Sequence, residues 1–63
     1  MNLIGQAIRH KTMGKGIVVG MEGSSVSICF SEGVREFPYP EAFLNELELR
    51  DNDLQKEIIA EMK

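Results

Sequence analysis

Two residues of this chain could take part in nucleophilic catalysis or in metal binding. They are His10 and Cys29, the single histidine and the single cysteine among 63 residues. A thiol nucleophile needs a base, and that base needs a third group to orient it. A structural zinc site needs four ligands. We therefore predict no enzyme, no metal and no cofactor, and we expect His10 to pack on Met13 and to hydrogen-bond the backbone of a turn.

The glycine-rich segment around Lys15 suggests a loop that holds phosphate. Such a loop reads Gly-x-x-x-x-Gly-Lys-Ser/Thr and lies between a strand and a helix. Here Gly14-Lys15-Gly16 is followed by a strand-forming run, Ile-Val-Val, at residues 17–19. We therefore expect the two glycines to provide turn or bulge geometry.

The aromatic residues could form a cage for a methylated cation, which requires several exposed rings. Phe30 and Phe37 stand at alternating positions typical of buried strand residues, and Phe43 falls in a predicted helical turn. Tyr39 is the one ring that we expect at the surface. The sequence therefore does not favour a cage.

Short apolar runs separated by glycine turns dominate the first fifty residues. The clearest alternation places Val26, Ile28 and Phe30 on one side of a strand, a period of two that is typical of a half-buried strand. In the first strand, Ile4 and Ile8 would also share one side. Further strands are predicted at residues 4–10, 17–21, 34–37 and 47–49, with a helical turn at 41–45. The pattern predicts a mainly β fold, a small SH3-like or Tudor-like barrel of about five strands.

The last residues predict an amphipathic helix. Asp51 or Asn52 would cap its start, and Asn52 with Gln55 makes a pair that resembles a capping box. A helix of about ten residues is unstable alone, so its apolar stripe must pack on the barrel, on a second copy or on another domain. We predict a barrel at residues 1–50 and a helix at 51–63. The stripe is the candidate partner-binding and self-association surface, and it consists of Leu54, Ile58, Ile59 and Met62.

The charge of −3 is unevenly distributed along the chain. Residues 1–35 carry a net charge of +2, and residues 36–63 carry −5. An acidic chain is repelled by phosphate backbones as a whole. A weak nucleic-acid patch on the basic loop is nevertheless an alternative, formed by Arg9, Lys11, Lys15 and Arg35.

The single cysteine and the hydropathy of the chain indicate in which cellular compartment the protein is expected. A lone cysteine suits a reducing environment, and the first residues lack the basic start and the apolar stretch of a signal peptide. No apolar run approaches the roughly 20 residues that span a bilayer. We expect a soluble, cytoplasmic protein.

The stretch from Ile8 to Val18 resembles the opening of the Tudor-like domain at the carboxy terminus of UvrD-type DNA helicases. That opening reads Val-x-His-x-x-Phe-Gly-x-Gly-x-Val, and the residues that match it are His10, Gly14, Gly16 and Val18. Met13 stands where the family has phenylalanine. Residues 37–43 are more similar to a related small bacterial module that is attached to varied larger proteins. The resemblance implies a small barrel, contacts with RNA polymerase and, in some members, contacts with nucleic acid. No ATPase motif is present.

These observations predict a non-catalytic interaction module. Its partner would be a protein, a second copy of itself or a larger bacterial machine, and no small-molecule substrate or membrane is expected. The alternative is a weak nucleic-acid-binding accessory that uses the basic loop at residues 9–16.

Overall fold

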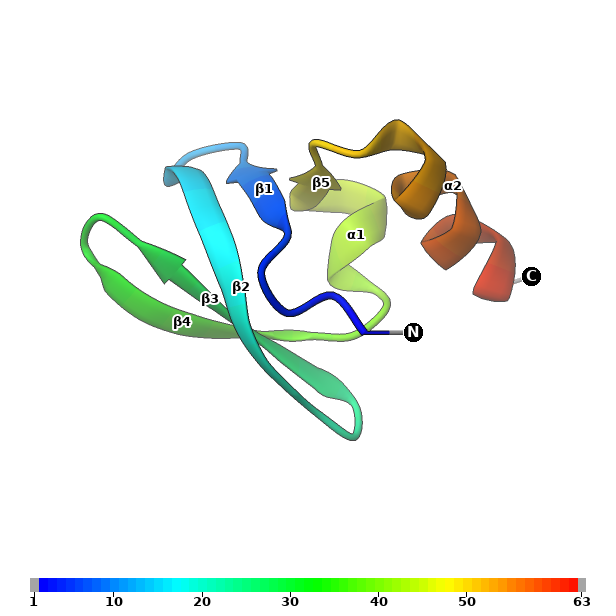
Figure 1. The fold of residues 1–63 in the computed structure, drawn as a ribbon, viewed down its shortest axis with the longest axis horizontal. Helices are drawn as coiled ribbons and strands as arrows, with labels where there is room; N and C mark the ends of the chain where they lie inside the picture. Colours follow the sequence, from blue (N-terminus) through cyan, green and yellow to red (C-terminus); the bar gives the residue numbers. More distant parts are fainter. Residues whose placement is uncertain (1, 63) are drawn as a thin grey trace.

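The computed structural model describes residues 2–62, which form one five-stranded antiparallel sheet and two helices (Figure 1). The strand order across the sheet is β4-β3-β2-β1-β5. The elements are β1 (Ala7–His10), β2 (Gly14–Glu22), β3 (Ser25–Phe30), β4 (Gly33–Pro38), α1 (Ala42–Asn45), β5 (Leu47–Leu49) and α2 (Asn52–Glu61). The predicted mainly β fold with five strands and a C-terminal helix is confirmed. The sheet is bent like a small barrel but is not closed, because β4 and β5 are its two edges.

The strand β3 follows the predicted alternation. Val26 and Ile28 are fully buried and Phe30 is nearly so, whereas Cys29 between them is exposed. The buried side faces a core that includes Ile8, Val18 and residues from both helices. Alternation of this kind separates a core-facing side of the sheet from an outer side.

The first strand is shorter than predicted. Gly5 has a φ of +92°, and the amide of Gln6 donates to the carbonyl of Leu3 at 2.9 Å, so this segment turns. The strand begins only at Ala7. As a result Leu3 is fully buried while Ile4 is 55% exposed, and the prediction that Ile4 shares a side with Ile8 is wrong.

Gly14 and Gly16 serve two different purposes in β2. Gly14 has a φ of +83°, as expected for a glycine at a turn. Gly16 has no such angle, and it provides space instead: a Cβ there would lie 2.7 Å from Cγ2 of Ile28 and 2.9 Å from two ring carbons of Phe30. Because Gly14 already pairs with His10, the predicted loop at residues 11–16 shrinks to a turn at 11–13.

The helix α2 packs on its own chain, beside α1 and β5 (Figure 1). Asp51 caps it, because its carboxylate accepts hydrogen bonds from the amides of Asp53 and Leu54. Gln55 forms no capping box. Its side chain instead donates to the carbonyl of Phe43 at 2.8 Å and accepts from the amide of Leu49 at 2.9 Å, which joins α2 to both neighbouring elements.

Candidate functional site

The outer side of the sheet carries two parallel rows of side chains that cross the strands. Strand register places residues directly opposite one another on the same face. The apolar row consists of Ala7, Ile17, Cys29 and Val34, one from each of β1 to β4. The charged row consists of Glu48, Arg9 and Lys15, from β5, β1 and β2. We call these seven residues together with Arg50 the outer face.

Arg50 lies opposite Ala7, in line with the apolar row and next to its β1 end. Its amide donates to the carbonyl of Ala7 at 3.0 Å, which continues the pairing of β5 with β1 by one residue. Since residues two apart share a face, Arg50 lies on the same side as Glu48. It completes a group of three cations and one acid on this part of the sheet.

Much of the outer face surrounds an open hollow of about 660 Å³. Its lining comes from β1, β2, β3, β5 and the start of α2, and it includes Arg9, Lys15, Ile17, Cys29 and Arg50. Large aliphatic side chains are exposed on this face: Ile17 is 44% and Val34 is 59% accessible. An apolar row beside charges is an arrangement that suits a binding surface.

Cations outnumber acids around the hollow although the chain as a whole is acidic. Three cations, Arg9, Lys15 and Arg50, stand there with one acid, Glu48, in a protein of net charge −3. Among residues 2–62, the one nitrogen–oxygen contact within 4.0 Å between a His, Lys or Arg side chain and a carboxylate joins His10 and Glu46. The three cations of the outer face are therefore without an ion-pair partner in that part of the chain.

The structure brings together only part of the predicted basic patch. Arg9 and Lys15 are a directly opposed pair on β1 and β2, and Lys11 is exposed in the turn between them. Arg35 is opposite the fully buried Ile28, so it lies on the other side of the sheet from Arg9 and Lys15. Sequence reasoning missed Arg50, although the alternation Leu-Glu-Leu at residues 47–49 already placed it on the side of Glu48.

The predicted partner-binding stripe of α2 contacts the core of its own chain. Ile58 is fully buried, and Leu54 and Met62 pack against the same core. Ile59 is half-buried. Binding of a partner at these four positions stays a prediction, and Ile58 is not at the surface to take part in it.

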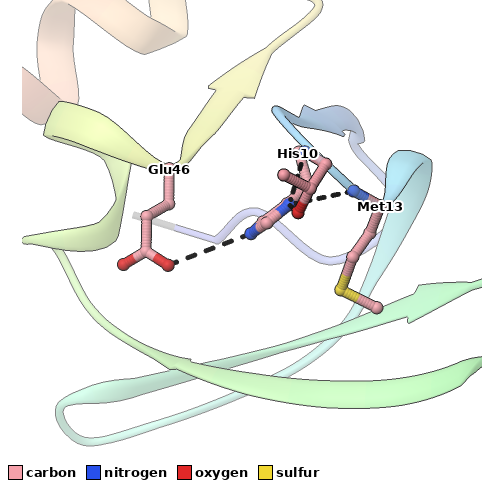
Figure 2. A network of polar contacts seen from close by, with 4 residues as sticks. His10, Met13 and Glu46 are labelled. Carbon is pink, nitrogen blue, oxygen red and sulfur yellow. Dashed lines mark hydrogen bonds and ion pairs between the residues drawn. The ribbon is translucent and has the colours of Figure 1, made fainter.

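His10 holds the turn that follows β1 (Figure 2). Its Nδ1 accepts hydrogen bonds from the amides of Thr12 and Met13, each at 3.1 Å, and the Thr12 hydroxyl lies at the same distance. The expected hydrogen bond to a turn backbone is confirmed. The ring packs on Phe30 and Phe37, with centroids 5.9 and 5.4 Å away.

Thr12, His10 and Glu46 have the residue types of a nucleophile, a base and an orienting acid. Figure 2 shows the His10 ring facing the Glu46 carboxylate, and Nε2 lies 3.9 Å from one of its oxygens. However, two backbone amides already use the Nδ1 lone pair that a base would need, and His10 as a whole is only 8% exposed. This arrangement stabilises a turn.

The four aromatic rings are buried or half-buried, and Tyr39, which was expected at the surface, is half-buried. Phe30 and Phe43 are buried, and Tyr39 packs edge-on against Phe43 with centroids 6.0 Å apart. The Tyr39 hydroxyl points to Glu61, at 3.4 Å from each carboxylate oxygen. Burial, the negative charge of Glu61 and this hydrogen bond raise the pKa of Tyr39 above 10.0.

Two further features concern the described residues 2–62 alone. They contain no group of three or more His, Cys, Asp or Glu side chains placed to hold a metal ion. None of their helices is long and apolar enough to cross a membrane.

Comparison with protein-family models, with curated proteins and with solved structures finds no match for this chain. The similarity to the Tudor-like domain of UvrD-type helicases therefore stays a prediction.

Proposed function

We propose that this chain is a non-catalytic interaction module that binds a protein partner through its outer face. The observation that carries the proposal is the apolar row from Ala7 to Val34, in which Ile17 and Val34 are exposed. Beside it lie Arg9 and Lys15, which have no ion-pair partner within residues 2–62. Burying aliphatic surface contributes roughly 25 cal/mol per Å². The neighbouring cations add selectivity for an acidic partner and faster association.

The outer face supports this role better than the helix stripe does. A partner that bound at Ile58 would have to remove α2 from the core, because that side chain is fully buried. Ile17 and Val34 are accessible without any rearrangement. An SH3-like module attached to a larger bacterial machine in the cytoplasm, where Cys29 stays reduced, agrees with this proposal.

A photo-crosslinking residue at position 34, in the full chain expressed in its native cell, tests the proposal. We expect it to capture a specific protein, and we expect the same residue at position 44 on α1 not to. Leu44 is a matched site because it is 54% exposed, close to the 59% of Val34. Equal capture at the two positions would contradict the proposal.

Substitution provides the complementary measurement. The pair Ile17→Lys and Val34→Lys should abolish binding of the captured protein, and Leu44→Lys should leave it unchanged. Both variants should unfold at nearly the same denaturant concentration as the parent chain, because all three side chains are exposed at the surface. Retained binding by the double variant would rule out the outer face.

A second candidate is weak nucleic-acid binding, favoured by the grouping of Arg9, Lys15 and Arg50 around one hollow. Binding of this kind weakens steeply with salt. Lys15→Glu should then reduce affinity for every DNA sequence alike, and Arg35→Glu, the same charge change on the other side of the sheet, should not. Affinity for a DNA duplex or single strand that does not change with salt would exclude this candidate.

A further inference from the structure

The direction of the apolar row limits the shape of what can cover it. The row from Ala7 through Ile17 and Cys29 to Val34 crosses four adjacent strands. Neighbouring strands lie about 4.8 Å apart, so the row is about 14 Å long and perpendicular to the strands. A partner segment that contacts the whole row must therefore cross the strands.

An extended segment suits this direction poorly. Extended peptides bind sheets by pairing their main chain along an edge strand, which means parallel to the strands. Laid across the face, such a segment would leave its amides and carbonyls without partners as it loses water, which is costly. A helix satisfies these groups internally, and three or four side chains along one helix face cover roughly 10–16 Å.

The charged row indicates which residue type the helix carries on one flank. Arg9 and Lys15 are two residues along their strands from Ala7 and Ile17, which is about 6.8 Å to one side of the apolar row. A helix about 10 Å wide that is centred on the apolar row reaches this position with the side chains on one flank. Acidic residues there would meet two cations that have no ion-pair partner within residues 2–62.

Resting on the proposed function, we infer that the partner presents an acidic amphipathic α-helix that lies across β1 to β4. Its aliphatic residues, at i, i+4 and i+7, cover Ile17, Cys29 and Val34. Asp or Glu on one flank faces Arg9 and Lys15. Glu48 lies at the β5 end of the charged row. Its negative charge disfavours an acidic residue at that end of the partner helix.

Designed peptides test the shape and the charge separately. The first probe is a side-chain-stapled helix with a leucine stripe and glutamates on one flank, since short helices are unstable in water without a constraint. The second carries lysines in place of the glutamates. The third is the first peptide with two central residues replaced by proline, which prevents a continuous helix. Each is titrated into the full chain, labelled with ¹⁵N, with amide shifts as the readout.

We expect the acidic helix to shift amides at residues 15–17, 29 and 34, and the lysine and proline peptides to shift none. Lys15→Glu should weaken binding by about two- to fivefold, in line with the loss of an exposed ion pair. Arg35→Glu changes charge equally on the other side of the sheet, and it should have no effect.

The other outcomes overturn different parts of the argument. Equal binding of the proline peptide would reject the helix while leaving the outer face as the docking surface. Shifts confined to α1 and α2 would reject the outer face and with it the proposed function. If no peptide binds at millimolar concentration and a DNA duplex shifts the same amides, the helix inference fails and the nucleic-acid alternative replaces it.

Discussion

The side-chain amide of Gln55 donates to the main-chain carbonyl of Phe43 at 2.8 Å, and its oxygen accepts from the amide of Leu49 at 2.9 Å. One side chain of α2 therefore satisfies main-chain groups of α1 and β5. Together with the burial of Ile58, this contact makes α2 part of the folded unit.

Replacing Gln55 should destabilise the fold. In Gln55→Ala, the carbonyl of Phe43 and the amide of Leu49 lose their side-chain partner in a partly buried place. We expect the free energy of unfolding to fall by about 1–3 kcal/mol in urea denaturation. Lys56→Ala, at the exposed neighbouring position, is the control and should change it by less than about 0.5 kcal/mol. Equal effects of the two substitutions would contradict the bridging role of Gln55.

Gly16→Ala should also destabilise the fold, because its methyl group would lie 2.7 Å from Ile28 and 2.9 Å from Phe30. Overpacking of this kind costs about 1–3 kcal/mol. Gly20→Ala is a matched control on the same strand, since the nearest atom to its methyl group would be Cβ of Ser27, at 3.7 Å. Thermal unfolding of the two variants should separate them clearly. A Gly16→Ala chain as stable as Gly20→Ala would mean that the sheet relaxes at no cost.

Replacing His10 should lower the free energy of unfolding, because the side chain both holds the turn and packs on aromatic rings. His10→Ala removes the acceptor for the amides of Thr12 and Met13 and the contact with Phe37. The expected loss is about 2–4 kcal/mol, from hydrogen bonds and packing together. Glu46→Gln should have a small effect, because the pair is 3.9 Å apart and the Glu46 side chain is 45% exposed. Hydrogen exchange of the amides of residues 12 and 13 should accelerate in His10→Ala and stay unchanged in Glu46→Gln.

The pair of Tyr39 and Glu61 predicts a loss of stability in alkali. Burial and the negative charge of Glu61 raise the pKa of Tyr39 above 10.0 in the folded chain. The folded state therefore holds the phenol proton more tightly than the unfolded chain does. This contribution is fully present below about pH 10 and is lost as the pH rises through the folded pKa.

An ultraviolet absorbance titration checks this directly, since Tyr39 is the single tyrosine of the chain. Its midpoint should lie above 10.0 in the parent chain and should move down in Glu61→Gln, which removes the neighbouring negative charge. Tyr39→Phe should flatten the decline of unfolding free energy above pH 10. An unchanged titration in Glu61→Gln would show that burial alone sets the pKa of Tyr39.

Local patterns were sufficient to predict much of the fold. The alternation of Val26, Ile28 and Phe30 predicted β3, and Asp51 was one of the two residues expected to cap α2. Predictions failed where one residue had more than one possible role. Gln55 could bond its own helix or a neighbouring element, and Gly5 could continue a strand or turn the chain away from it.

By itself the sequence determined where most of the strands and both helices lie and which side of β3 is apolar, because those properties depend on neighbours along the chain. Only the tertiary structure decided which strands lie side by side. That pairing brings Arg9, Lys15 and Arg50 to one face and places Arg35 on the other side of the sheet. It also buries Ile58 and leaves Ile17 and Val34 accessible. These outcomes depend on contacts between residues far apart in the sequence, which local spacing does not encode.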